Sequence, residues 1–280
     1  MFEWLQKKDT TVVEKSNEQK TEFDDAIARD ILHDIKEEFG LDYSRQEEIT
    51  LRKIERFSLK NNIYNFSDLK TEIKTSSELK EQLINMLTIG ETYFYREAGH
   101  FKILTQLMEK RPIQSILCAP SSSGEEVYSI LLYIQEHFSK IPDITITGID
   151  INSDFIQAAK DASYSTRSIS LLPKGILQNN FTLNNSKYSL SPTLKKYAHF
   201  QKQNIFDQRS LSRLGMFDII FCRNMLIYFD EKQKKEALEN LHKILLKDGL
   251  LFIGHADISF DPKGFQKIHS ENGTYLQKLF

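Results

Sequence analysis

Polar side chains follow several apolar runs of this sequence, at the points where buried strands are expected to end. Asp150 ends "DITITGID" and Asn204 follows "YAHFQKQ". Arg223 and Asn224 follow "FDIIFC", and Tyr228 lies in the apolar run that comes next. In a doubly wound sheet, ligands bind outside the carboxyl ends of the strands. These side chains therefore predict a site for a polar ligand at one edge of a sheet.

A serine-rich turn, "PSSSGEE", follows a further apolar run, "IQSILCA". Gly124 and the serines would bring backbone N–H groups to a ligand at a helix start. The turn does not match G-x-G-x-x-G, so a dinucleotide site has weak support. An alternative is a capping box formed by Ser123 and Glu126, which needs no ligand. Asp150 follows the turn at roughly the spacing of a ribose-binding carboxylate, although Asp150 or Asn152 is equally suited to cap a helix.

Several other chemistries lack their motifs. The sequence has no G-x-x-x-x-G-K-[ST] and no G-x-S-x-G, so phosphate-loop and serine-hydrolase sites are not supported. Its seven histidines and two cysteines show neither H-E-x-x-H nor C-x-x-C spacing, and no metal site is expected. The remaining prediction is a ligand with a ribose and no pyrophosphate. S-adenosylmethionine is the most common cofactor of this kind.

The stretch "IGETYFYREAGHF" lies outside the expected sheet and contains three consecutive aromatic residues. One interpretation is that these aromatics pack a domain junction. The other is that Thr92 and Arg96 also contact the carboxylate of the cofactor, because arginine binds carboxylates with two hydrogen bonds.

The elements that would position these residues fall into two parts. Residues 21–90 show helical spacing, as in Ile27, Ile31, Ile35 and Phe39, with Gly40 as a C-cap. Three helices are expected here, including "SRQEEITLRKIERF" and "SSELKEQLINMLTIG". Helical periodicity places four cations on the side of the second helix opposite its apolar residues. These cations are Arg45, Arg52, Lys53 and Arg56.

Residues 91–280 alternate short apolar runs with amphipathic helices, which predicts an α/β fold with parallel βαβ units. A helix is expected from about Glu231 to Leu246, closed by Asp248-Gly249. The period-2 runs around Asn272-Gly273 predict an antiparallel carboxyl-terminal hairpin. A small β insertion is expected near residues 181–200, and residues 1–20 are expected to form a flexible tail.

The composition is that of an ordinary soluble protein. A formal net charge of −2 gives no reason to expect nucleic acid as the partner. No apolar run approaches the length of a membrane helix, so no membrane insertion is expected. Two cysteines beside apolar runs indicate a reducing, cytoplasmic setting.

With these pieces in order, the chain resembles the CheR family, the chemoreceptor glutamate methyltransferases of bacteria. The resemblance runs from about residue 22 to the carboxyl terminus. "TYFYRE" is similar to the family segment T-x-F-F-R-E, "SSSGEEVYS" to S-T-G-E-E-P-Y-S, and "FCRNMLIYFD" to F-C-R-N-V-L-I-Y-F-D. "GLLFIGHAD" is similar to G-L-L-x-x-G-H-S-E.

The resemblance implies a class I, Rossmann-like methyltransferase domain preceded by a helical domain that docks on the cytoplasmic helical bundle of methyl-accepting chemotaxis receptors. The cofactor would be S-adenosylmethionine and its product S-adenosylhomocysteine, with glutamate methyl esters formed on the receptor. Arg96 and Tyr228 match positions near the reacting methyl group. The positions implied to contact the cofactor are Thr92, Arg96, Glu126, Asp150, Asn204, Ile205, Arg223 and Asn224. Arg45, Arg52, Lys53 and Arg56 would face the receptor, or else form a solvated surface paired with Glu48 and Glu55.

The chain also departs from the family pattern. Gly90 stands where the family commonly has an asparagine that contacts the cofactor, so that contact is expected to be lost or replaced by backbone. Asp257 keeps, in "GHAD", the carboxylate of G-H-S-E. Two alternatives follow: a CheR-like module that binds the cofactor with weak catalysis, or a methyltransferase with another acceptor.

Overall fold

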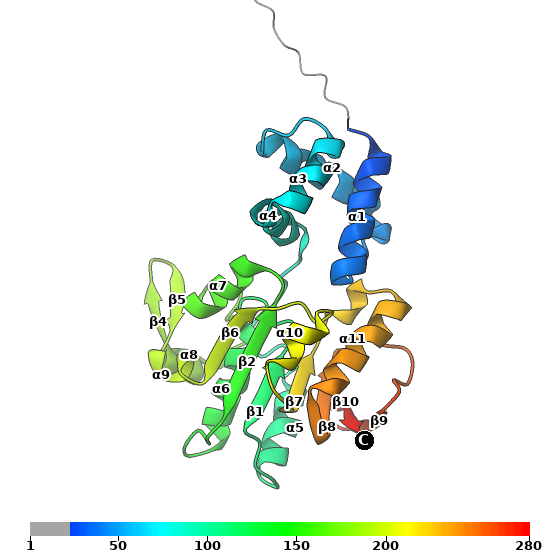
Figure 1. The fold of residues 1–280 in the computed structure, drawn as a ribbon. Coiled ribbons are helices and arrows are strands. Elements are labelled where there is room, and N and C mark those ends of the chain that lie inside the picture. Colours follow the sequence, from blue (N-terminus) through cyan, green and yellow to red (C-terminus); the bar gives the residue numbers. More distant parts are fainter. Residues whose placement is uncertain (1–22) are drawn as a thin grey trace, which may run out of the picture.

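The computed structural model describes residues 23–280, so the tail expected at residues 1–20 lies outside the described part. A helical bundle sits above a mixed sheet with helices on both faces (Figure 1). The helices of the bundle are α1 (Asp25–Phe39), α2 (Glu47–Lys60), α3 (Phe66–Thr75) and α4 (Ser77–Leu87), with a 3₁₀ turn, η1 (Ser44–Gln46), before α2.

Local signals fix the ends of the bundle helices. The side chain of Asp24 accepts the N–H of Ala26 at the start of α1, and Gly40 ends α1 at φ 76°, as predicted. Helix α3 was not predicted. Its signal is present, because Asn65 caps it and Phe66, Leu69 and Ile73 form its buried face.

The second predicted helix begins later than expected. Arg45 lies in η1 and not in α2, which starts at Glu47. The other three cations, Arg52, Lys53 and Arg56, lie on α2, and all four are exposed. These four residues are called the basic face below.

The main sheet has seven strands in the order β6-β2-β1-β7-β8-β10-β9. The strands are β1 (Ser115–Cys118), β2 (Thr145–Asp150), β6 (Ala198–Lys202), β7 (Phe217–Cys222), β8 (Leu245–Ile253), β9 (Phe265–Ser270) and β10 (Gly273–Lys278). The first five in this order are parallel. Because the chain goes from β1 outward to β2 and β6, and then returns to β7 and β8, the order reverses between β1 and β7.

Helices cover both faces of this sheet, so the domain is a doubly wound α/β sheet with an antiparallel carboxyl-terminal hairpin, as predicted. The helices outside the bundle are α5 (Gly99–Met108), α6 (Glu125–His137), α7 (Ser153–Asp161), α8 (Lys174–Asn180), α9 (Pro192–Lys195), α10 (Gln208–Ser212) and α11 (Glu231–Lys243). Apolar residues of α5, α6 and α7 form one core with the sheet, and those of α10 and α11 form the other. Strands such as β7 are therefore buried on both sides.

The carboxyl-terminal elements confirm one expectation and correct another. The predicted hairpin forms, with Gly273 pairing with Ser270 and β10 antiparallel to β8. The preceding helix was predicted too long, because α11 ends at Lys243 and β8 already begins at Leu245. Leu245 pairs with Phe217 of β7, so strand pairing replaces the last helical turn.

A second small sheet lies beside α7 (Figure 1). Strands β4 (Phe181–Asn184) and β5 (Lys187–Leu190) form an antiparallel hairpin, to which β3 (Ser163–Tyr164) adds. The insertion expected near residues 181–200 overlaps this hairpin, whereas residues 198–200 already belong to β6 of the main sheet.

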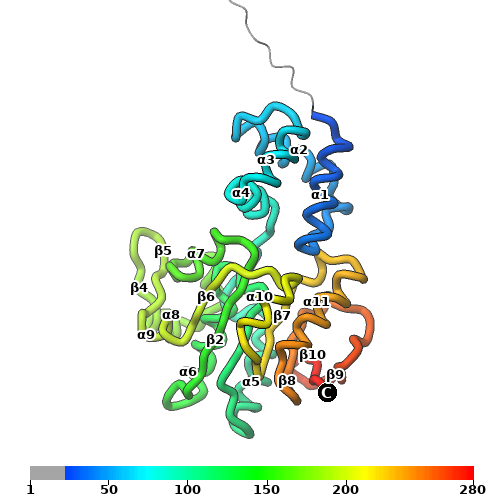
Figure 2. The backbone as a smooth tube through the Cα atoms, viewed as in Figure 1, coloured from blue at the N-terminus to red at the C-terminus, as the bar shows by residue number. Residues whose placement is uncertain are grey.

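Hydrogen bonds and ion pairs tie the helical bundle to the sheet domain at several places. Asn85 of α4 and Ser153 of α7 exchange two hydrogen bonds, of 2.9 and 3.1 Å. The lower end of α1 reaches the segment before α11 (Figure 2), where the N–H of Asp42 donates to the carbonyl of Tyr228. The bundle therefore borders the edge of the sheet at which the strands end.

Candidate active site

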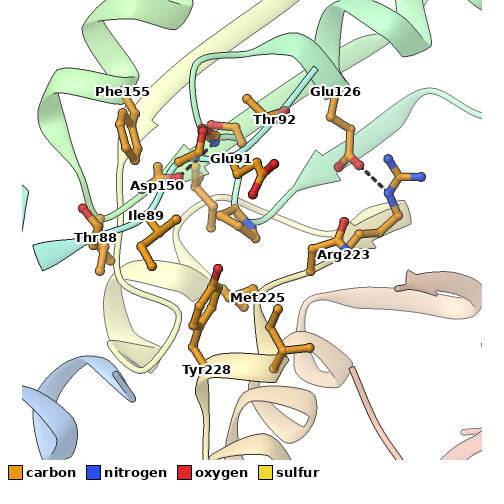
Figure 3. Close-up of a pocket in the computed structure, with 18 of the residues that line it drawn as sticks. Thr88, Ile89, Glu91, Thr92, Glu126, Asp150, Phe155, Arg223, Met225 and Tyr228 are labelled. Atoms are coloured by element: carbon orange, nitrogen blue, oxygen red, sulfur yellow. Dashed lines mark hydrogen bonds and ion pairs between the residues drawn. The ribbon is translucent and has the colours of Figure 1, made fainter. Parts of the chain in front are cut away.

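A cavity lies at the carboxyl ends of β1, β2, β6 and β7, where the strand order reverses (Figure 3). Its remaining walls are the segment between α4 and α5 and the segment that follows α1. The structure brings every predicted cofactor and catalytic residue to this one cavity. These residues are Thr92, Arg96, Glu126, Asp150, Asn204, Ile205, Arg223, Asn224 and Tyr228.

Asp150 is the buried anion at the end of β2. One of its oxygens accepts the N–H of Ser122 and the other accepts the N–H of Asn152, both at 2.9 Å. Burial raises the pKa of Asp150 to about 6, against the opposing effect of these backbone donors. A carboxylate has about four acceptor positions, so Asp150 retains capacity for further hydroxyl donors. Asn152 caps α7 by accepting two N–H groups, as one of the alternatives predicted.

Arg223 is the most deeply buried cation of the cavity wall, with a side chain only 2% exposed. Its Nε donates to Glu126 at 2.5 Å, and its Nη atoms donate to the carbonyls of Arg96 and Glu97. Arg96 and Glu97 lie in one turn. Glu97 has a left-handed φ of 52°, which is strained for a residue other than glycine. Arg223 thus holds the turn that carries Arg96, in addition to lining the cavity.

Glu126 is free to reach Arg223 because the predicted capping box does not form. Gly124, at φ 92°, is the residue before α6, and no side chain caps the helix there. Ser123 donates instead to the carboxylate of Glu125, at 2.6 Å. The capping interpretation of Ser123 and Glu126 was therefore wrong, because the left-handed glycine moves the helix start to Glu125.

Asn224 joins two further acidic groups below the cavity. Its backbone has a left-handed φ of 58°, and its N–H donates to the fully buried Asp257 at 2.8 Å. Its side-chain amide donates to Glu97 at 3.3 Å. Burial raises the pKa of Asp257, with an added contribution from the charge of Glu97. The carboxylate of "GHAD" thus fixes the backbone of a cavity residue.

Arg96 and Tyr228 are the two half-buried polar side chains expected near the reacting group. Arg96 donates to the carbonyl of Glu91 at 2.7 Å, and its guanidinium lies 5.6 Å from the ring centroid of Tyr93. Tyr228 points its hydroxyl into the cavity (Figure 3). Burial raises the pKa of Tyr228, so the phenol stays protonated at neutral pH and is a hydrogen-bond donor.

Asn204 already has protein partners on both ends of its side chain. The amide donates to the carbonyl of Glu38 at 2.7 Å, and its oxygen accepts the N–H of Phe206 at 3.0 Å. Asn204 therefore links β6 to the end of α1 as well as lining the cavity. Ile205, beside it, is buried and apolar.

Sequence reasoning missed some of the lining residues. Tyr43, between α1 and α2, lines the cavity and donates to the carbonyl of Leu87 at 3.1 Å. Burial raises its pKa, and the nearby Tyr228 adds to the effect. Phe155 of α7 also lines the cavity. Neither residue had a signal, because Tyr43 lies in an irregular segment and Phe155 fits the apolar spacing of an ordinary helix.

Lys36 connects the segment around Tyr43 to the start of α11, near the Tyr228 side of the cavity. Its ammonium lies 3.0 Å from Asp42 and 2.9 Å from Asp230, which caps α11. The N–H of Asp42 donates to the carbonyl of Tyr228. This part of the bundle is thus one wall of the site.

The basic face lies outside the cavity. Arg52 pairs with Glu48 at 2.5 Å, as expected if the face is a solvated surface paired with its own acidic neighbours. Lys53 and Arg56 form no ion pair within residues 23–280, and they line a surface groove with Asn85 and Asp154. The face is therefore only partly neutralised by its own neighbours.

In residues 23–280 no three histidine, cysteine or acidic side chains are grouped as metal ligands would be. None of the helices described combines the length and the apolar character that crossing a membrane requires. Cys118 and Cys222 are both free and buried.

The family model and the similar proteins found by comparison all name methyltransferases. A family model described as "CheR methyltransferase, SAM binding domain" matches residues 90–274. A chemotaxis protein methyltransferase of Campylobacter jejuni is 38% identical over 249 residues, covering 88% of this chain and 93% of that protein. Chemotaxis protein methyltransferase 2 of Vibrio cholerae is 36% identical over 194 residues, covering 66% of this chain and 67% of that protein.

Solved structures are more distant. An O-methyltransferase family protein from Burkholderia thailandensis is 12% identical, with a TM-score of 0.41, and the match covers 72% of this chain and 58% of that one. A likeness of this size says nothing about the acceptor.

Proposed function

The chain belongs to the CheR methyltransferase family, and on this premise we propose that it transfers a methyl group to glutamate side chains of chemotaxis receptors. Its methyl donor is S-adenosylmethionine, as in the family. Glutamate methyl esters and S-adenosylhomocysteine would be the products.

The residues of the cavity fit this cofactor. Asp150 has its two oxygens oriented by backbone donors and keeps acceptor positions for ribose hydroxyls. Glu126 uses one oxygen for Arg223 and lines the cavity, and its other oxygen would accept from the ammonium of the cofactor. Thr92, Asn204, Ile205 and Asn224 complete the proposed cofactor contacts.

The proposed acceptor needs no general base. A glutamate carboxylate is ionised at neutral pH, because its reference pKa is about 4.3. The cofactor supplies a methyl group on a positively charged sulfur, which a carboxylate oxygen attacks directly. The protein must then align the reacting atoms and keep water away, since a solvated carboxylate is a weaker nucleophile.

Arg96 and Tyr228 are the proposed catalytic residues. The observation that carries this proposal is that a guanidinium and a neutral phenol border one cavity with Asp150, although they come from distant parts of the sequence. Arg96 would orient the acceptor carboxylate, and Tyr228 would donate a hydrogen bond beside the transferring methyl. Arg223 would support the role of Arg96 by holding its carbonyl.

We propose residues 21–90 as the receptor-docking domain and residues 91–280 as the methyltransferase domain. The basic face suits an acidic face of a receptor helix bundle, because Lys53 and Arg56 have no ion-pair partner in the described part of the chain. Such receptors place this bundle in the cytoplasm, and the two free thiols suit that reducing compartment.

Transfer of labelled methyl groups to receptor-containing membranes tests the proposal. We expect label on the receptor that mild alkali releases as methanol, because carboxyl esters are base-labile. Arg96→Ala should remove this label, and the matched variant Arg213→Ala, an exposed arginine outside the cavity, should keep it.

Two results would overturn the proposal. Bound cofactor without labelled receptor would favour a binding module. Label on small molecules or nucleic acid, but not on receptor, would identify another acceptor.

A further inference from the structure

Gly90 lies on the cavity wall directly beneath the ring of Phe155. A Cβ atom added to Gly90 would lie 2.3 Å from Cζ and 2.6 Å from Cε2 of that ring, closer than real Cβ contacts allow. The backbone of Gly90 is not left-handed, so its conformation does not demand glycine. Glycine is needed here because the Phe155 ring fills the space of a side chain at residue 90.

A hydrogen-bonded frame fixes the distance between the ring and Gly90. Asn152 is buried and accepts the backbone N–H of Phe155 at 3.1 Å. Its amide donates to the hydroxyl of Thr88 at 2.6 Å and to the carbonyl of Asn85 at 3.1 Å. One side chain therefore holds both the start of α7 and the segment that leads to Gly90.

The ring is half-buried and forms part of the cavity wall. It stands beside Asp150, at the end of the cavity away from the Arg223–Glu126 pair (Figure 3). If Asp150 holds the ribose, the nucleoside lies at this end of the cavity, within reach of the ring.

We infer that Phe155 is a cofactor-binding residue, whose ring forms the aromatic wall for the adenosine of S-adenosylmethionine in the place that a side chain on residue 90 would occupy. An aromatic ring offers a flat, apolar face to a purine and makes no demand on hydrogen-bond donors. This inference extends the family assignment and does not depend on the identity of the acceptor.

Calorimetry with S-adenosylhomocysteine tests the role of the ring. We expect Phe155→Ala to weaken binding by about tenfold or more, in the range found for loss of base stacking. Phe155→Leu keeps an apolar side chain without a π face, and it should also weaken binding. The matched variant Phe138→Ala, a half-buried phenylalanine outside the cavity, should leave binding unchanged.

A fragment of the cofactor separates the nucleoside from the amino acid. 5′-Methylthioadenosine retains the adenosine and lacks the amino-acid group, so Phe155→Leu should weaken its binding by the same factor. The inference is overturned if folded Phe155→Leu, checked by thermal melting, binds either ligand as the wild type does. It is also overturned if only S-adenosylhomocysteine is affected, because the ring would then contact the amino-acid end.

The packing of the ring on Gly90 is tested by coupling. Gly90→Ala alone should weaken S-adenosylhomocysteine binding, since the new methyl displaces the ring from the wall. In the Phe155→Ala background the same change should have little further effect, because the space is then free. Equal effects of Gly90→Ala in both backgrounds would show that the ring is not held by this contact.

Discussion

Two arginine–glutamate pairs of this protein have the same short contact and opposite surroundings. Arg52 and Glu48 on α2 are 2.5 Å apart, with side chains 68% and 80% exposed. Arg223 and Glu126 in the cavity wall are also 2.5 Å apart, with side chains 2% and 12% exposed. The first pair joins residues on adjacent turns of one helix, whereas the second joins the end of β7 to the start of α6.

The comparison shows that distance alone does not measure an ion pair. Water screens the charges on α2, and exposed pairs of this kind contribute little. In the cavity wall, removing Glu126 would leave a buried guanidinium unpaired, and removing Arg223 would leave a largely buried carboxylate unpaired, and either change is strongly destabilising. The buried pair also organises the turn of Arg96 and Glu97 by hydrogen bonds that the exposed pair lacks.

The largest expected difference between the two pairs is the loss of stability when the arginine of each pair is replaced. Arg223→Met is expected to lower the free energy of unfolding by about 3–5 kcal/mol, because the Glu126 side chain, only 12% exposed, is left without its partner. Arg52→Met should give a change at the limit of detection. Urea denaturation of both variants measures the two effects.

Equal losses of stability in these variants would contradict the comparison. A stable Arg223→Met protein with normal methyl transfer would further show that the turn of Arg96 needs no support from Arg223.

Cofactor binding should depend on pH because the buried carboxylate of Asp150, unlike an exposed one, titrates close to neutral pH. The pKa of Asp150 is raised to about 6, so the carboxylate becomes protonated as the pH falls through this value. Affinity for S-adenosylhomocysteine should therefore fall by about tenfold between pH 7.5 and pH 5, since the ionised form binds the ribose. Asp150→Asn should bind more weakly and lose this pH dependence, as measured by calorimetry.

Protonation of Asp150 does not unfold the free protein as the pH falls, so unfolding caused by Asp150 cannot explain the loss of affinity. Its folded-state pKa lies above the value of the unfolded chain, so its contribution to the stability of the free protein rises as the pH falls. Constant wild-type affinity down to pH 5 would show that the Asp150 carboxylate is not a cofactor contact.

The basic face should matter for docking and not for the cavity. Lys53→Glu/Arg56→Glu is expected to raise the KM for receptor about tenfold, because charge complementarity steers association. The kcat and the affinity for S-adenosylhomocysteine should not change. A control pair, Lys102→Glu/Lys110→Glu, carries the same charge change on and just after α5, at the opposite end of the molecule (Figure 1).

An equal rise in KM for the control pair would indicate a general charge effect. No rise for either pair would place receptor docking elsewhere on the protein.

Much of the site could be predicted because its residues follow strands. Apolar runs that end in Asp150 and Cys222 indicate buried parallel strands, and the carboxyl ends of such strands meet at one edge. The hairpin around Asn272-Gly273 and the C-cap Gly40 were also predictable, since they depend on local backbone preferences. Each of these inferences needs only a few neighbouring residues.

Errors arose where two local signals competed or where partners were distant. Ser123 and Glu126 had the spacing of a capping box, but Arg223 is a stronger partner for Glu126 than a helix end. The predicted helix extended to Leu246, but Leu245 pairs with Phe217 of the neighbouring strand and is therefore not helical.

The sequence by itself determined the class of the fold, the edge of the sheet that holds the site and the side chains expected to line it. Only the tertiary structure decided that Arg223 donates to the carbonyls of Arg96 and Glu97, that Tyr43 lines the cavity, and that the Phe155 ring occupies the space beside Gly90. The reason is physical. Local periodicity sets the strand ends. The partner of a buried charge, and the side chain that fills a small space beside a glycine, depend on chain segments that meet only after folding.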